Sequence, residues 1–420
     1  MRQSLSPLRL RGFPQLASAY TINELGNWVG EIALAVLVFD QTGSPLATAA
    51  LFLGMQFAPS LIGQGVIARL EVTGTRIALP ALYLGEAAVF VALAATVDNF
   101  SLAVVIALAV VDGTLAIAAR AFTRASAAAV LTPSGRLREG NAIINVGFTA
   151  AGAAGPAIAG VVVAALGVET ALLIDAGSFV AVAALLVATV SLPQVKGEAE
   201  PWMRRLREGI AYVKGSPVLS RLLAMQAAAF VFFTLVLPIE IVYAKETLDA
   251  GNSGYGALLS AWGVGMVGGS LLFVAMSRRV SLRAQLFFST ALIGGAYLAM
   301  AAAGSIAMAC AAAVFGGFGN GVQWVALLSA VQELTESRFQ ARVVGLLESI
   351  GRMMPGVGFI LGGVVAQVLD PRACFVVAGA GALSVLLIAT PLLRDVGWTG
   401  AGPAQPDAPA SGEAPEPANV

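Results

Sequence analysis

Twelve stretches of this chain are each long and apolar enough to cross a lipid bilayer as a helix, which takes about 20 mostly apolar residues. Their approximate limits are 15–38, 46–68, 77–97, 102–122, 142–166, 170–191, 219–243, 255–276, 284–303, 306–330, 343–368 and 372–393. A backbone in hydrocarbon must satisfy its own hydrogen bonds, so such segments form helices. The sequence therefore predicts an all-α polytopic membrane protein with twelve transmembrane helices.

Charged residues make up only 11% of the chain, against roughly 25% in soluble domains. The absence of His removes the usual zinc ligand and Ser-His catalysis, which leaves carboxylates as the candidate proton carriers. The two cysteines, Cys310 and Cys374, lie inside apolar runs and are expected to pack there. We therefore expect no metal site, no cofactor and, at a formal net charge of +0, no nucleic-acid partner.

Basic residues are distributed unevenly between the two sides of the predicted bundle. With twelve spans, 21 of the 24 Lys and Arg residues fall on one side; Lys245 and Arg372 fall on the other, and Arg352 lies within a span. Basic residues favour the cytoplasmic side of a membrane. The pattern therefore predicts a multi-pass protein of the inner (plasma) membrane with both termini in the cytoplasm.

The two halves of the chain repeat one layout around residues 120–167 and 333–370. In each, a basic connection leads into an apolar helix that is rich in Gly and contains one Pro. At an offset of 203 positions, Leu131 coincides with Leu334, Thr132 with Thr335, Gly155 with Gly358 and Gly160 with Gly363. A membrane chain whose second half repeats its first is a common design of secondary transporters.

This repeat divides the chain into five parts. The predicted parts are a cytoplasmic N-terminal segment (1–13), a first six-helix half (14–191), a central cytoplasmic loop (192–218), a second six-helix half (219–393) and a tail (394–420). In the loop, apolar residues at helical spacing alternate with arginines, which predicts an amphipathic helix on the inner leaflet. The tail is rich in Pro, Gly and Ala and is predicted to be disordered.

Four strings resemble the major facilitator superfamily, and within it the branch that contains the enterobactin exporter and macrolide efflux proteins. They are ELGNWVGEIALAVLVFDQTGSPL at 24–46, QFAPSLIGQGVIARL at 56–70, residues 131–160, and RFQARVVGL at 338–346. The resemblance covers about residues 14 to 393. One motif departs from the superfamily pattern Gly-x-x-x-Asp-Arg-x-Gly-Arg between helices 2 and 3, because Arg69 stands where the Asp belongs.

The resemblance implies the major facilitator fold, with two pseudo-symmetric six-helix halves. It also implies a secondary active transporter: a proton-coupled antiporter that exports amphipathic small molecules, such as siderophores or drugs, by alternating access. The implied partners are a small-molecule substrate, protons as the coupling ion and the lipid bilayer, for a chain that acts as a monomer.

Four polar residues of the first span, Tyr20, Glu24, Asn27 and Glu31, lie within about 60° of arc on one helix face. Ionisable groups at membrane depth are costly unless they face a cavity or a partner. We interpret the stripe as facing a central cavity, with Tyr20 and Asn27 near substrate and Glu31 as the deeper proton carrier. Glu24, closer to the basic side, is expected to stay hydrated. A network that only packs helices is the alternative.

In the fourth span, Asp112 lies mid-membrane and Arg120 approaches the basic end. Antiporters of the superfamily often carry an Arg in this helix that assists proton transfer, and Arg120 resembles it by location. Snorkelling of Arg120 to the interface is the alternative. Asp112 and Arg120 therefore join Glu24 and Glu31 as proton-coupling candidates.

The fifth span carries Gly152, Gly155, Pro156 and Gly160, which resemble the antiporter Gly-Pro motif and permit close helix approach. In the eleventh span, Glu348 and Arg352 are four residues apart and can pair on one face. We assign both sets to helix packing or gating.

The second half supplies the remaining cavity candidates, namely Gln226, Phe233 and Glu240 of the seventh span and Gln323 of the tenth. Packing against lipid or core is the alternative for each.

Two other functional classes stay open at this point. No phosphate-binding Gly-x-x-x-x-Gly-Lys-Ser/Thr loop occurs, so ATP is not the direct energy source. A membrane-embedded enzyme would need His, clustered Cys or a long polar loop, and the chain has none of these, so we predict no enzyme. A transport-inactive sensor or scaffold of the same fold is compatible with the altered loop between helices 2 and 3.

Overall fold

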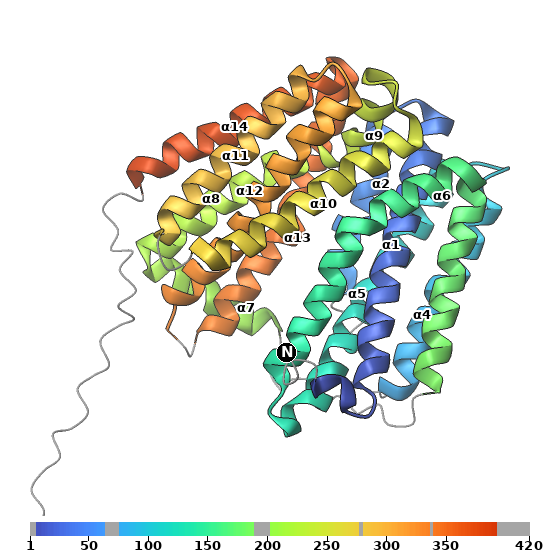
Figure 1. Cartoon of the computed structure of the whole chain (residues 1–420), viewed down its shortest axis with the longest axis horizontal. Helices are drawn as coiled ribbons and strands as arrows, with labels where there is room; N and C mark the ends of the chain where they lie inside the picture. Colours follow the sequence, from blue (N-terminus) through green and yellow to red (C-terminus); the bar gives the residue numbers. More distant parts are fainter. Residues whose placement is uncertain (1–5, 64–74, 189–201, 277–279, 337–338, 393–420) are drawn as a thin grey trace, which may run out of the picture.

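The computed structural model describes residues 6–63, 75–188, 202–276, 280–336 and 339–392, and these ranges contain helices and turns but no strand (Figure 1). The first half comprises η1 (Ser6–Arg9), α1 (Phe13–Thr42), α2 (Pro45–Phe52), the π-helical η2 (Leu53–Phe57), α4 (Thr75–Ala95), α5 (Leu102–Leu131), η3 (Thr132–Ser134) and α6 (Leu137–Val187). The loop with Arg69 and the tail 394–420 lie outside the described residues.

The second half repeats this order after a linker helix, α7 (Trp202–Gly215). It comprises α8 (Pro217–Thr234), η4 (Leu237–Ile239), α9 (Glu240–Val242), η5 (Tyr243–Thr247), α10 (Gly251–Met276), α11 (Leu282–Ala302), α12 (Ile306–Glu333), α13 (Gln340–Val368) and α14 (Pro371–Leu392).

Eleven helices in the described part of the chain are long and apolar enough to cross a membrane. One of them, α6, contains two spans, because Gly167 has φ 82° and ψ 167° in its middle. Only Gly adopts such a backbone without strain. The break falls in the predicted gap between 142–166 and 170–191, so the twelve-helix prediction is confirmed.

Local sequence fixes where these helices begin and end. Gly43 has a positive φ of 57° and terminates α1. Ser44 then accepts a hydrogen bond from the amide of Ala47 and precedes Pro45 at the first helical position of α2. Ser216 and Pro217 start α8 in the same way. A side-chain cap followed by Pro is a strong helix start, because it satisfies the free amides of the first turn.

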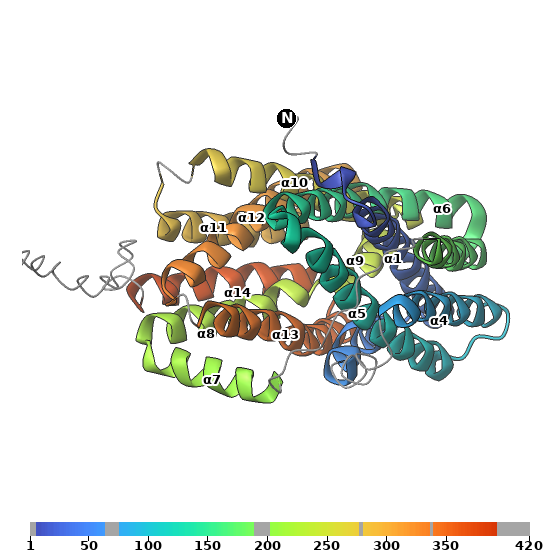
Figure 2. The same cartoon turned by 90° about the horizontal axis from the view of Figure 1, so that it is seen from below.

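Equivalent glycines make equivalent contacts in the two halves. A Cβ at Gly155 of α6 would lie 2.7 Å from Trp28 of α1, and one at Gly358 of α13 would meet α8. Likewise Gly160 lies against α10 of the other half, and Gly363 lies against α2. α1 is the first transmembrane helix of the first half, and α8 is that of the second half. The sequence repeat at offset 203 is therefore also a repeat in space, between the two helix bundles of Figures 1 and 2.

Between described residues, the halves are in contact from the middle of their helices to one side of the bundle. We call the helix ends that carry Arg124, Arg221, Arg283 and Arg342 the basic side. On the opposite side, Lys245 pairs with Asp40, and the hydroxyl of Ser44 lies 3.3 Å from Oε1 of Gln367. Figure 1 shows the bundles converging there, near α2 and α9, and diverging towards the basic side, where α7 lies.

The linker helix α7 docks on the second half. The Tyr212 ring stacks on Phe339 at 4.3 Å, and Glu208 pairs with Arg342 at 2.9 Å. A Cβ at Gly209 would lie 3.0 Å from the carbonyl oxygen of Arg342, so the helices touch closely. The C-terminal part of α7, from Glu208 to Tyr212, is therefore packed against protein.

Candidate functional site

The polar stripe of α1 faces α5, and two arginines of α5 meet it. Nη2 of Arg124 donates a 2.8 Å hydrogen bond to the Tyr20 hydroxyl, and its guanidinium lies 5.4 Å from the Tyr20 ring centre. Nη1 of Arg120 lies 3.9 Å from Oε1 of Glu24. The Arg120 side chain is 41% exposed, whereas that of Glu24 is 6% exposed. The bond to Tyr20 places Arg124 in this cluster as well.

The two remaining members of the stripe lie deeper along α1. Asn27 and Glu31 are both partly buried, and the amide nitrogen of Asn27 has no partner among described residues. Glu31 lies within electrostatic range of Arg120 and Glu24. Glu24 is the more buried carboxylate of the two, so the expectation that it stays hydrated is wrong. Arg120 is therefore the cation that Glu24 and Glu31 share. We call these two residues the cavity carboxylates, after the cavity that the sequence predicts beside them.

Three further carboxylates lie inside the first half. Asp112 of α5 and Asp175 of α6 are buried, and so is Glu86 of α4. Sequence analysis proposed Asp112, assigned no role to Asp175 and missed Glu86. A lone carboxylate in the middle of the apolar span 77–97 was the signal that identifies Glu86, since such residues are rare and usually functional.

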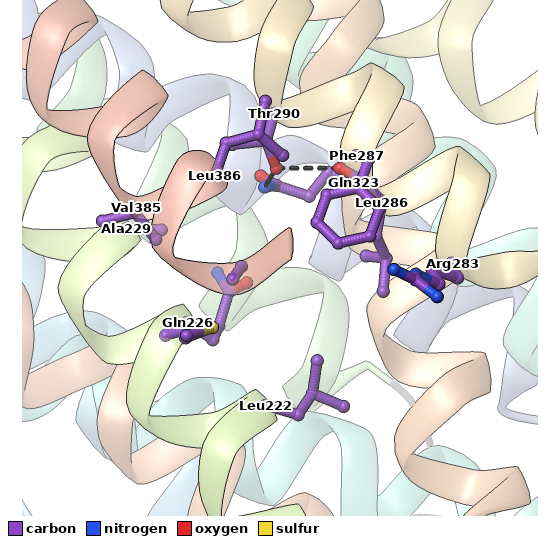
Figure 3. A pocket seen from close by; sticks show the side chains of 12 residues that line it. Leu222, Gln226, Ala229, Arg283, Leu286, Phe287, Thr290, Gln323, Val385 and Leu386 are labelled. Atoms are coloured by element: carbon purple, nitrogen blue, oxygen red, sulfur yellow. Dashed lines mark hydrogen bonds between the residues drawn. The ribbon is translucent and has the colours of Figure 1, made fainter. Parts of the chain in front are cut away.

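The second half offers a pocket lined by α8, α11, α12 and α14 (Figure 3), with about 470 Å³ of empty space, part of it open. Gln226 and Gln323 enter it from α8 and α12, and Nε2 of Gln323 donates a 2.9 Å hydrogen bond to the Thr290 hydroxyl. Arg283 lies at its rim. The rest of the lining is mainly apolar: Leu222, Met225, Ala229, Leu286, Phe287, Val385, Leu386 and Ala389.

A second, smaller pocket adjoins the first, because Gln226, Ala229 and Gln323 line both. Its other walls are three aromatic rings, one amide and one aliphatic side chain: Phe230, Phe233, Trp324, Asn320 and Leu327. The ring centres of Phe230 and Trp324 lie 6.5 Å apart. The cavity candidates Gln226, Phe233 and Gln323 therefore lie together, whereas Tyr20 and Asn27 lie on α1. Amides among aromatic rings suit a flat, largely apolar molecule.

Glu240 lies apart from these pockets, at the break that follows η4. It is buried, Oε2 has no partner among described residues, and Glu31, Tyr255 and Tyr297 are within its electrostatic range. Glu31 of the first half and Glu240 of the second half are therefore within electrostatic range of each other, below the side where the halves meet.

The packing candidates occupy the contact between the halves or its edge. The carbonyl oxygens of Gly152 and Pro156 lie against Gly263 and Gly256 of α10. Glu348 and Arg352 of α13 are exposed, and the described chain shows no ion pair between them. Gly356, one turn beyond Arg352, packs on Phe57 of η2, so this face of α13 points towards the first half.

The described residues contain no group of three or more acidic, Cys or His side chains arranged to hold a metal ion. The arrangement can bind protons on carboxylates and an apolar molecule between aromatic rings. A family model for the transmembrane secretion effectors matches residues 2–396.

The chain belongs to this family of the major facilitator superfamily. The family places it among membrane transporters and not among enzymes. Over 263 residues it is 25% identical to the multidrug efflux pump Tap of Mycolicibacterium fortuitum, a match that covers 61% of this chain and 63% of Tap.

Solved structures show the same fold. The nucleoside transporter NupG superposes with a TM-score of 0.70 at 12% identity, over 91% of this chain and 99% of NupG. A bacterial homologue of the iron transporter ferroportin, in an inward-facing state, superposes with a TM-score of 0.70 at 13% identity, over 90% and 98% of the two chains.

Proposed function

We propose that this protein is a proton-coupled exporter of amphipathic small molecules, drugs or siderophores, that works by alternating access. The ion pair of Arg120 and Glu24 between α1 and α5 is the observation that carries the proposal. A carboxylate buried in a membrane bundle, as Glu24 is beside the partly exposed Arg120, is expensive and usually serves transport. The amide and aromatic pocket of the second half supports an apolar substrate, and the similarity to a multidrug efflux pump supports export.

In this mechanism Glu31 binds a proton from one side and releases it on the other as the halves rock. Burial disfavours the charged form of a carboxyl group, and a nearby cation favours it. Arg120 lies within electrostatic range of Glu31 in this structure, so a movement of Arg120 away from Glu31 would change the balance between these two effects. Two states that differ in proton affinity are what exchange requires.

Export by purified protein in proteoliposomes tests the function, with ethidium as a drug-like probe, an imposed pH gradient and pyranine reporting internal pH. Wild-type protein should move ethidium against its gradient and protons the other way. Glu31→Gln keeps the shape and removes the titration, so it should stop gradient-driven export while folding normally. Undiminished export by this variant would assign Glu31 to packing. Flux of neither ethidium nor a catecholate siderophore would favour the transport-inactive sensor.

The proposed orientation has both termini in the cytoplasm of a plasma-membrane protein that acts as a monomer. A Cys introduced at Asn252, on the side opposite the basic ends, should react with an impermeant thiol reagent added outside intact cells. One introduced at Ser134 should not. The reverse result would overturn the orientation.

A further inference from the structure

Glu86, Asp112 and Asp175 come from three different helices and lie within electrostatic range of one another in the interior of the first half. Glu86 and Asp175 are fully buried and Asp112 is 8% exposed. Both carboxylate oxygens of Glu86, Oδ1 of Asp112 and Oδ2 of Asp175 have no hydrogen-bond partner within the described ranges. Ser178 donates to the other oxygen of Asp175 at 3.1 Å.

The charged surroundings of this cluster are almost entirely acidic. The groups that act on Glu86 are Asp112 and Arg120 of α5, Asp175 of α6 and Glu24 of α1. Arg120 is the one cation among them, and it lies beside Glu24 with a substantially exposed side chain. Among the described residues, Arg120 forms its ion pair with Glu24 and none with the three acids of the cluster, so it neutralises them only from a distance.

Two features show that the first half is built around these carboxylates. A Cβ at Gly26 or Gly30 of α1 would overlap an oxygen of Asp175, so the two glycines form a notch that admits the carboxylate. Asn23 lies on the same face of α1 as these two glycines. It is 1% exposed, and both of its amide atoms have no partner in the described chain. At the repeat offset the second half has Ala229, Phe233, Ser289 and Ala378 where the first has Gly26, Gly30, Glu86 and Asp175. The fold itself therefore does not require the acids.

An unpaired ionised carboxylate is very costly to bury, and three close together also repel one another. A bound cation would relieve this, but the described acids do not form a metal-holding group. We propose that Glu86, Asp112 and Asp175 form a proton-binding site inside the first half, separate from the cavity carboxylates and occupied by protons in the conformation described here.

This site deepens the proposed function, on which its role in coupling rests. Arg120 acts on the cavity carboxylates Glu24 and Glu31 and also on Glu86 and Asp112. A movement of Arg120 between the two groups as the halves rock would release protons from the one it approaches. The site then stores the proton while the cavity carboxylates exchange with solvent.

Infrared difference spectroscopy of the purified full-length protein tests the site directly, because a protonated carboxyl group has a C=O stretching band separate from those of carboxylates. Wild-type protein should show such bands, and they should shift in D₂O. Glu86→Gln and Asp112→Asn should each remove part of the intensity. Glu169→Gln, at an exposed acid beside the α6 break, is the matched control and should remove none. Unchanged bands in both interior variants would overturn the proposal.

Transport by the same variants tests the coupling role. Glu86→Gln should retain ethidium exchange without a pH gradient. Its gradient-driven export should fall at least about fivefold, which is the lower end of a typical coupling between sites. Full gradient-driven export by Glu86→Gln would overturn the role in coupling. If export by the wild-type protein does not depend on the pH gradient, the proposed function fails. The infrared bands still decide whether the site binds protons. A thermal unfolding curve identifies any variant that has not folded.

Discussion

The two halves share one helix arrangement but fill their interiors differently. The first half places five carboxylates and two arginines among α1, α4, α5 and α6. In the second half, α12, the counterpart of α5, carries no charged residue before Glu333. There the interior holds one buried carboxylate, Glu240, among amides and rings, and Trp262 stacks on Tyr297 at 5.4 Å.

This difference indicates a division of labour between halves of common architecture. Both pockets described above lie wholly in the second half, and the carboxylate cluster lies wholly in the first. Rocking of one half against the other would then link proton binding in one to substrate binding in the other. Variants of the first half should change the drive for transport, and variants of the second should change affinity.

The largest effect is expected from Arg120→Gln, which gives α5 the neutral amide character of α12. It removes the cation shared by Glu24, Glu31 and Glu86, so the two states should no longer differ in proton affinity. Gradient-driven export of ethidium should fall by at least about tenfold, within the 5–150-fold range of typical coupling. Exchange without a gradient is the internal control. If Arg120→Gln retained gradient-driven export, the contrast between the two halves would fail, because the proton route would then bypass α5.

Sequence alone predicted the spans, the repeat and the α1 stripe because these depend on apolar length and helical period. It proposed Gln226, Phe233 and Gln323 as cavity residues but did not predict that they line one pocket. It also missed Glu86. Which helices pack together decides such sites, and packing in lipid depends on close backbone contacts, such as Gly160 on Gly256, that a pattern in one helix does not specify.

The amphipathic pattern of α7 shows a second limit of sequence reasoning. Apolar spacing predicted the helix, but it could not distinguish a lipid surface from a protein surface as the partner. The stacking of Tyr212 on Phe339 and the pair of Glu208 with Arg342 involve residues more than 120 positions apart. Only the fold brings them together.

A second, smaller effect is expected on stability when Gly26 is replaced by Ala, the residue at the equivalent position 229. The added Cβ would overlap Asp175, and overpacking of a core typically costs about 1–3 kcal/mol. Thermal unfolding of the purified protein should therefore shift to lower temperature.

Asp175→Ala is the matched partner, since Ala378 occupies that position in the second half. The double variant Gly26→Ala/Asp175→Ala should recover much of the lost stability, because Ser178 is then free to turn aside and no carboxylate fills the notch. Additive losses would show that Gly26 does not make room for Asp175.

A third, still smaller effect is expected from Gln323→Leu in the pocket of the second half. It removes one of the two amides that both pockets share, and a hydrogen bond is worth about 0.5–1.5 kcal/mol net. The apparent affinity for ethidium should change about twofold to tenfold, while the dependence of export on the pH gradient stays as in wild type. A lost gradient dependence would contradict the division between halves. Val325→Leu, on the same helix but outside both pockets, is the control.

The smallest effect is expected from Thr290→Val, which retains the side-chain shape and removes the hydroxyl that accepts the hydrogen bond from Gln323. Gln323 would lose its anchor but could turn into the pocket, so the apparent affinity should change by no more than about threefold, below one full hydrogen bond. If the hydroxyl acts only by orienting Gln323, Thr290→Val should have no further effect in a Gln323→Leu background. Independent, additive effects would show that Thr290 contacts the substrate itself.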